Sequence, residues 1–126
     1  LMAIPNSSTP MTNIDIDGNN SFDALTDGLL ILRSMFGLTG AALTSGATAD
    51  DAMFVSSGDL AQRYDSALNI LDIDGNGQLD ALTDGLLILR FLFGLRGEEL
   101  VSQATADDAA RSSPQEIEDY LATLIQ

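Results

Sequence analysis

Two short segments of this sequence carry carboxylate, amide and hydroxyl side chains at alternate positions. A chain that turns tightly brings alternate side chains to one side, where their oxygen atoms can surround a cation. Calcium prefers about six to eight such oxygen ligands, whereas magnesium keeps several of its waters and rarely uses all-protein cages. We therefore predict two calcium ions, with the ligands Asp15, Asp17, Asn19, Ser21, Asp23 and Asp27 in loop 1 (residues 15–27) and Asp72, Asp74, Asn76, Gln78, Asp80 and Asp84 in loop 2 (residues 72–84).

The end of each loop differs from a 12-residue EF-hand calcium loop, in which a glutamate occupies position 12. Position 12 is here a threonine, Thr26 or Thr83, and the next carboxylate is at position 13. We predict that this carboxylate, Asp27 or Asp84, is the terminal ligand, with the threonine as the alternative. If a helix begins near position 9, positions 9 and 13 share one of its faces, so the aspartate at position 9 binds directly or through water. Position 6 needs a residue that tolerates positive φ, as glycine and asparagine do.

An internal repeat identifies the elements that position these loops. The segment from Asp23 to Arg33 returns unchanged as Asp80 to Arg90, a shift of 57 positions. We assign repeat 1 to residues 14–69 and repeat 2 to residues 71–126, and together they form one domain over residues 13–126. Residues 1–12 are interpreted as a linker or a remnant of a neighbouring segment, because proline and serine are frequent there.

Each loop leads into a short apolar helix, expected over residues 28–36 and 85–93 and followed by a glycine. A second helix is expected over residues 58–69 and again after Ser113, where Ser113-Pro-Gln-Glu116 is a capping box. The predicted fold class is all-α, with two EF-hand-like loop–helix repeats in a pseudo-two-fold arrangement and additional helices. The apolar residues at loop position 8, Phe22 and Leu79, are expected to pair the loops through a very short ladder.

Composition excludes several classes of function. The formal net charge is −14, from 19 acidic and 5 basic residues, so nucleic acid and anionic membrane surfaces would repel the chain. Histidine and cysteine are absent, which removes the usual general base and the imidazole and thiolate metal ligands. Every clustered carboxylate belongs to a loop and no nucleophile–base set is found, so we do not expect an enzyme.

Three features leave alternatives open. The apolar helices are either buried on both faces or expose a patch to a partner. Arg33 and Arg90 either pair with nearby aspartates or mark that partner face. The paired acids that follow Ala-Thr-Ala in both repeats cap a helical turn, stay solvated, or add an outer calcium ligand; they are Asp50, Asp51, Asp107 and Asp108.

The segments Asp15–Leu38 and Asp72–Leu95, each a calcium loop with its exiting helix, resemble the dockerin repeat of bacterial secreted and cellulosomal proteins. The repeat is longer than a typical dockerin repeat, and its loop has one extra residue before the final aspartate. The resemblance implies an extracellular or cell-surface bacterial protein, calcium-dependent folding, and binding of a larger secreted protein to a cohesin-like or other protein receptor. The alternative is a calcium-stabilised structural or secretion-associated module without such a receptor.

Overall fold

The computed structural model describes residues 10–126, and residues 1–9 of the predicted linker lie outside the described part. Between residues 10 and 126 the chain forms helices and loops and no strand, so the predicted all-α class is confirmed. The α-helices are α1 (Leu29–Met35), α2 (Gly40–Thr44), α3 (Ser57–Ser66), α4 (Leu86–Leu92), α5 (Glu98–Val101) and α6 (Pro114–Thr123); the shorter turns are the π-helical η1 (Ala24–Gly28) and η3 (Ala81–Gly85) and the 3-10 turn η2 (Leu68–Ile70).

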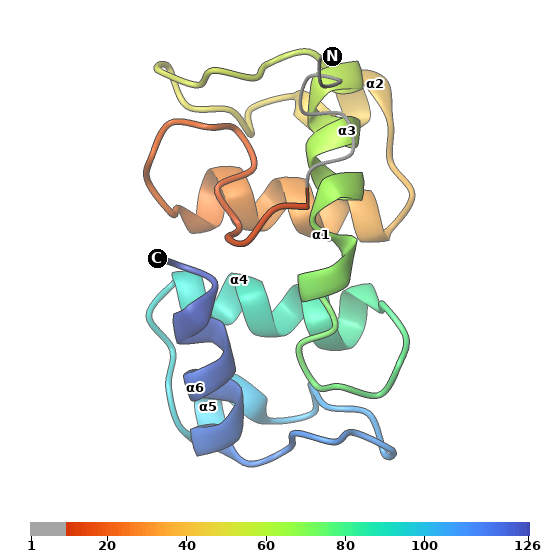
Figure 1. The fold of residues 1–126 in the computed structure, drawn as a ribbon, viewed down its shortest axis with the longest axis vertical. Coiled ribbons are helices and arrows are strands. Elements are labelled where there is room, and N and C mark those ends of the chain that lie inside the picture. The colour runs from red at the N-terminus through yellow and green to blue at the C-terminus, as the bar shows by residue number, and fades with distance from the viewer. Residues whose placement is uncertain (1–9) are drawn as a thin grey trace, which may run out of the picture.

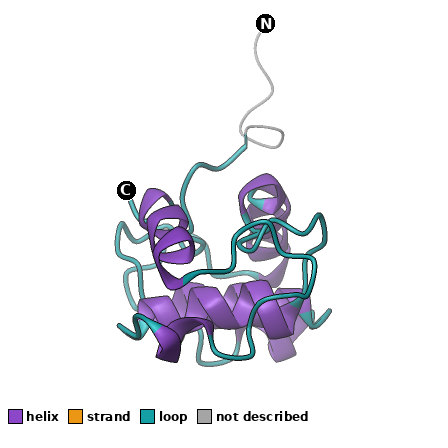
Figure 2. Cartoon of the chain, turned by 90° about the horizontal axis from the view of Figure 1, so that it is seen from below, coloured by secondary structure: helices purple, strands orange, loops and turns teal. Residues whose placement is uncertain are grey.

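The two repeats stack on one another, with α1 and α4 side by side at their junction (Figure 1). α2 and α5 extend this layer at its two ends, and α3 and α6 form a second layer in front of it (Figures 1 and 2). Loop 1 and loop 2 lie on opposite sides of the molecule, so each site is built within one repeat (Figure 1). None of the described helices has both the length and the apolar character needed to cross a membrane.

The contact between α1 and α4 depends on one glycine from each repeat. A Cβ atom at Gly85 would lie 2.8 Å from Leu32 Cδ1, and one at Gly28 would lie 3.0 Å from Leu89 Cδ1. A Cβ at either glycine would have to displace the leucine methyl group, so each leucine packs closely on the backbone of the other repeat. The core joins the two layers through fully buried side chains of α1, α3, α4 and α6, namely Leu30, Ile31, Leu60, Leu87, Ile88, Ile117 and Leu121.

Local sequence signals determine where most of these helices begin and end. Ser113 Oγ accepts a hydrogen bond from the Glu116 N–H (3.2 Å) and Glu116 Oε1 accepts one from the Ser113 N–H (3.2 Å), which confirms the predicted capping box. Ser56 Oγ likewise accepts from the Asp59 N–H (3.1 Å) at the start of α3. Gly37 and Gly94 follow α1 and α4 with φ angles of 83° and 96°, as expected of glycines that end helices.

Several sequence-based expectations need correction. α3 ends at Ser66 and not at residue 69, because η2 turns the chain toward loop 2. The short helices α2 and α5 were not predicted. The predicted ladder between the loops does not form anywhere in residues 10–126, since the exiting helices, and not the loops, meet at the junction of the repeats.

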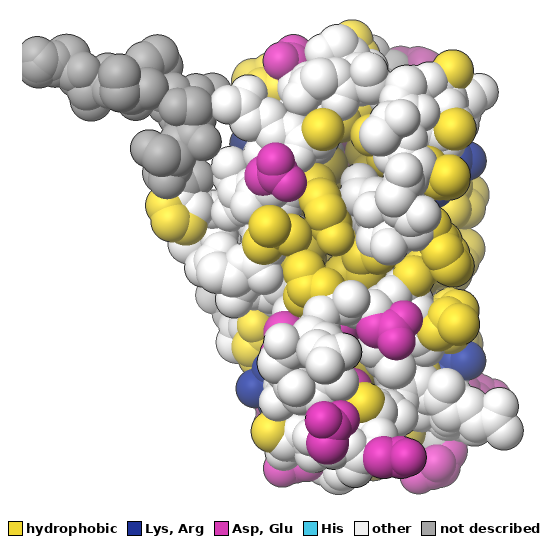
Figure 3. All heavy atoms as spheres, turned by 90° about the vertical axis from the view of Figure 1, so that its right-hand side faces the viewer, with side chains coloured by type: hydrophobic (Ala, Val, Ile, Leu, Met, Phe, Trp, Pro, Cys, Tyr) yellow, Lys and Arg dark blue, Asp and Glu magenta, His cyan; other side chains and the backbone are white. Residues whose placement is uncertain are grey.

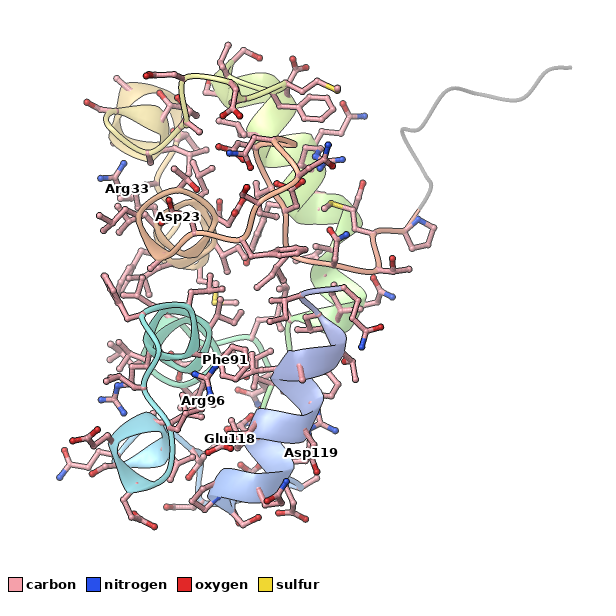
Figure 4. All side chains as sticks on the ribbon, turned by 90° about the vertical axis from the view of Figure 1, so that its left-hand side faces the viewer. Asp23, Arg33, Phe91, Arg96, Glu118 and Asp119 are labelled. Carbon is pink, nitrogen blue, oxygen red and sulfur yellow. The ribbon has the colours of Figure 1, made fainter. Side chains whose placement is uncertain are left out.

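The two arginines of the apolar helices bond to backbone carbonyls, which differs from the pairing with aspartates that was one of the two alternatives. Arg33 Nη1 donates to the backbone carbonyls of Leu43 (3.0 Å) and Ser45 (2.8 Å), at the end of α2. Figure 4 shows Arg33 extending from α1 toward this helix. Arg90 makes the equivalent bonds to Leu100 and Ser102 (3.0 and 2.8 Å), so each arginine ties an exiting helix to the short helix that follows it.

Candidate metal centres

In each loop the carboxylates at positions 1, 3 and 13 come together. The three side chains place one oxygen atom each within 4.8 Å of the other two, an arrangement that could hold a metal ion. All three are buried in repeat 1, whereas in repeat 2 the aspartate at position 1 is half-buried. These groups are called triad 1 (Asp15, Asp17 and Asp27) and triad 2 (Asp72, Asp74 and Asp84).

A π-helical turn brings the last aspartate of loop 1 to its triad. The Gly28 N–H donates to the Asp23 carbonyl (3.1 Å) and the Leu29 N–H to the Ala24 carbonyl, so donor and acceptor are five residues apart. A π turn holds one residue more than an α-helical turn. It therefore accommodates the extra residue of the loop and lets Asp27, at position 13, close the triad. The turn Ala81–Gly85 does the same in repeat 2.

Backbone N–H groups fix the orientation of this terminal carboxylate. Asp27 Oδ1 accepts from the N–H groups of Ile16 (2.7 Å) and Asp17 (3.3 Å), and its Oδ2 accepts from Asp23 (3.0 Å). A carboxylate has about four lone-pair sites, so these bonds leave it able to bind a cation. The same three bonds reach Asp84, from Ile73, Asp74 and Asp80.

The first aspartate of each loop holds the turn closed. Asp15 accepts from the N–H groups of Gly18 (3.1 Å) and Asn19 (3.2 Å) through Oδ1 and of Asn20 (2.9 Å) through Oδ2. Asn20 has a φ of 66° and Gly77 a φ of 86°, which confirms that position 6 needs a residue tolerant of positive φ. Asp72 accepts the equivalent bonds from Gly75, Asn76 and Gly77.

The central aspartate of each triad carries an oxygen atom without a hydrogen-bond partner. Asp17 and Asp74 are fully buried, and their Oδ2 atoms accept from the N–H groups of Ala49 (3.0 Å) and Ala106 (2.8 Å). Within residues 10–126, neither Asp17 Oδ1 nor Asp74 Oδ1 has a partner. Burying such an oxygen is unfavourable unless a cation or a donor compensates it. Because the same atom is affected in both repeats, the residues fit a cation at each triad.

The segment that follows α2 lies against loop 1; we call residues 47–54, and the equivalent residues 104–111, the straps. The N–H groups of Met53 and Phe54 both donate to the Asp17 carbonyl (2.9 and 3.0 Å). Asp51 Oδ1 accepts from Asn19 Nδ2 (3.2 Å), as Asp108 does from Asn76 in repeat 2 (3.4 Å). Each of these strap carboxylates is therefore bonded to the asparagine at loop position 5, which orients the asparagine side chain.

The other predicted ligands lie outside the triads. Asp23 and Asp80 accept from the N–H groups of Leu25 (3.0 Å) and Leu82 (2.9 Å), so they cap the π-helical turns. The asparagines at position 5 accept from the N–H groups at position 7, which belong to Ser21 and Gln78. Coordination by positions 5, 7 and 9 therefore stays a prediction.

Burial raises the pKa values of three of these carboxyl groups, those of Asp17, Asp27 and Asp84. Loss of solvation raises the pKa of Asp27 from 3.8 to about 7, and the negative charge of Asp17 adds to this, against the lowering effect of the backbone N–H of Asp23. Loss of solvation also raises the pKa of Asp84 to about 6, and it raises the pKa of Asp17. A cation would oppose these shifts, because it favours the ionised carboxylates.

Sequence reasoning missed the groups that reach the loops from elsewhere in the chain. Arg63 donates to the carbonyls at loop positions 1 and 2 in repeat 1, and Arg111 does so in repeat 2. The repeated Ala-Thr-Ala-Asp-Asp motif was a signal for the strap, which supplies the N–H groups of Ala49 and Ala106. The arginines gave no such signal, because they stand at different positions of the two repeats.

Each candidate centre thus consists of three aspartate carboxylates. These are hard oxygen donors, which suit calcium, magnesium or manganese better than softer metals. Comparison with the models of protein families, with curated proteins and with solved structures finds no match to this chain.

Proposed function

We propose that this chain is a calcium-binding module that holds one ion in each loop and depends on both ions for its fold. The observation that carries this proposal is the buried Oδ1 atom of Asp17 and of Asp74, each without a hydrogen-bond partner in a residue of a carboxylate triad. The loops are EF-hand-like in their ligand spacing, and the π-helical turn, which brings position 13 to the triad, supports a role for this residue like that of position 12 in an EF-hand. Calcium is favoured over magnesium because it accepts such flexible, many-oxygen loops.

Calorimetric titration with calcium chloride tests this proposal. We expect two ions per chain, and magnesium to bind at least about 100-fold more weakly, because it gives up its hydration water reluctantly. Asp17→Asn and Asp74→Asn should each leave one site, since each removes the charge of one central ligand. A parent stoichiometry of zero or one would contradict the two-site proposal.

We further propose that the loaded module is dockerin-like and attaches a larger secreted protein to a protein receptor. Two large apolar residues on the exiting segment of each repeat support this: Leu25 and Phe36 are 55% and 56% exposed, and Leu82 and Phe93 are 59% and 57% exposed. Hydrophobic side chains gather between the two repeats on the face shown in Figure 3. Such exposed apolar groups at equivalent positions suit a protein contact, and the net charge of −14 favours a basic partner surface.

Capture of secreted bacterial proteins on the immobilised module, with calcium and with chelator, tests the receptor proposal. We expect calcium-dependent capture of a defined protein that is lost in a Leu25→Ser/Leu82→Ser double variant. The calcium stoichiometry and melting temperature of this variant should match the parent, because both leucines are exposed. If the parent captures nothing in calcium, the structural module without a receptor becomes the better proposal.

A further inference from the structure

An arginine and an aromatic ring have exchanged places between the two repeats. A shift of 57 positions aligns Phe54 with Arg111 and Arg63 with Tyr120. In repeat 1 the arginine is on α3 and the ring is on the strap, whereas in repeat 2 the arginine is on the strap and the ring is on α6. The guanidinium carbon of Arg63 lies 4.3 Å from the centre of the Phe54 ring, and that of Arg111 lies 3.9 Å from the centre of the Tyr120 ring.

The exchange preserves the contact that each arginine makes with its loop. Arg63 donates through Nη2 to the Asp15 carbonyl (2.5 Å) and through Nε to the Ile16 carbonyl (3.0 Å). Arg111 donates through the same two atoms to the carbonyls of Asp72 and Ile73 (both 2.8 Å). The guanidinium groups therefore bind the same two carbonyls, at loop positions 1 and 2, although they come from different elements.

These two carbonyls belong to the peptide units that hold the terminal ligand. In a trans peptide unit the carbonyl and the following N–H are coplanar and point in opposite directions. The Asp15 carbonyl thus lies opposite the Ile16 N–H, and the Ile16 carbonyl opposite the Asp17 N–H. Both N–H groups donate to Asp27 Oδ1, at 2.7 and 3.3 Å. In repeat 2, Arg111 bonds in the same way to the two peptide units whose N–H groups donate to Asp84 Oδ1.

We propose that Arg63 and Arg111 are positioning residues of the two metal centres, each acting through two peptide units to set the terminal carboxylate. The stacked ring holds the guanidinium over the loop. The ring can come from the strap or from the helix, because the guanidinium donors are fixed in one plane and stack on it in the same way. The effect of these arginines on calcium affinity rests on the proposed calcium function. Their effect on the peptide N–H groups that bond to the terminal carboxylate does not depend on it.

The test exchanges the pair in repeat 1 and uses repeat 2 as the internal control. Phe54→Arg alone places two arginines and no ring beside loop 1, and Arg63→Tyr alone places two rings and no arginine there. The double variant reproduces the arrangement of repeat 2. Calcium binding is followed by NMR through the amide signals of Asn20 and Gly77, whose N–H groups bond to the first aspartate of each loop. Arg63→Lys keeps the charge but loses the two-pronged contact, and it serves as a milder variant if Arg63→Tyr does not fold.

We expect Arg63→Tyr to weaken calcium at loop 1 by about 10-fold or more, as loss of groups that orient metal ligands does, and the double variant to recover most of this. Loop 2 should be unchanged. In the calcium-free protein, hydrogen exchange at the Ile16 and Asp17 amides should accelerate in Arg63→Tyr and recover in the double variant. A double variant no better than the worse single variant in either measurement would overturn the proposal. If the parent binds no calcium, the calcium function fails, and the exchange data alone decide the positioning role.

Discussion

Removal of calcium is expected to lower the melting temperature of this protein by about 15 °C or more, or to leave a partly folded chain. Each triad brings three carboxylates within 4.8 Å of one another, and most of them are buried. Like charges at this separation repel by roughly 1 kcal/mol per pair even in water, and by more where solvent is excluded. Three pairs in each of two triads therefore oppose the fold by an amount comparable with the whole stability of a small domain, about 5–15 kcal/mol.

Bound calcium would convert this repulsion into attraction, and its binding free energy would become folding free energy. The terminal aspartates lie within η1 and η3, which continue directly into α1 and α4, so a disordered loop would also release the helices at the junction of the repeats. Thermal unfolding followed by circular dichroism, with calcium and with excess chelator, measures the effect. Superimposable melting curves would show that the core folds independently of the loops.

Protons should relieve the unfavourable burial of charge, and with it the repulsion, in the calcium-free protein. The pKa of Asp27 is raised to about 7 and that of Asp84 to about 6, from 3.8 in both cases. Between these values and 3.8 the native state holds protons that the unfolded chain has released, so stability falls as the pH rises through this window. The calcium-free protein is thus expected to melt at a higher temperature at pH 5 than at pH 7.5. Equal melting temperatures at the two pH values would count against strained triads.

Loss of the terminal ligand is expected to have the second largest effect. Asp84→Ala should weaken calcium binding at loop 2 by roughly 100-fold or more, because even groups that only orient metal ligands contribute 10–100-fold. Asp84 is fully buried and accepts the N–H groups of Ile73, Asp74 and Asp80, so alanine removes a ligand charge and three hydrogen bonds together. Asp84→Asn, which keeps the side-chain shape, isolates the loss of charge. Site-resolved titration by NMR measures both variants.

Thr83→Ala is the matched control for this prediction. Thr83 occupies position 12, where an EF-hand has its last ligand, but its Oγ1 only donates to the Asp80 carbonyl at 3.5 Å. We expect this variant to change calcium affinity by less than about 3-fold, in keeping with a weak surface hydrogen bond. If Thr83→Ala is more damaging than Asp84→Ala, position 12 closes the loop and the assignment of position 13 is wrong.

Sequence spacing predicted the three members of each triad among six ligands per loop, but it did not distinguish them from the residues at positions 5, 7 and 9. The aspartates at positions 1, 3 and 13 are joined by one short turn, so their meeting depends on local backbone geometry and on the start of the exiting helix. The capping box at Ser113 and the glycines after α1 and α4 are similarly local, since each requires contacts only between residues within one helical turn. The π-helical form of the turn before α1 could not be predicted, because the sequence shows an extra residue but not where the helix accommodates it.

Tertiary structure decided what surrounds each triad. The Ala49 N–H reaches Asp17 across 32 residues, and Arg63 reaches Ile16 across 47. Such contacts depend on how the strap and the second layer pack on the exiting helices, which no spacing along the chain specifies. The same packing separates the two loops, because Gly28 and Gly85, which immediately precede α1 and α4, allow those helices to meet at the junction while the loops turn outward. The local sequence thus determined which carboxylates meet in each loop. Only long-range packing buried these carboxylates and positioned the groups that orient them.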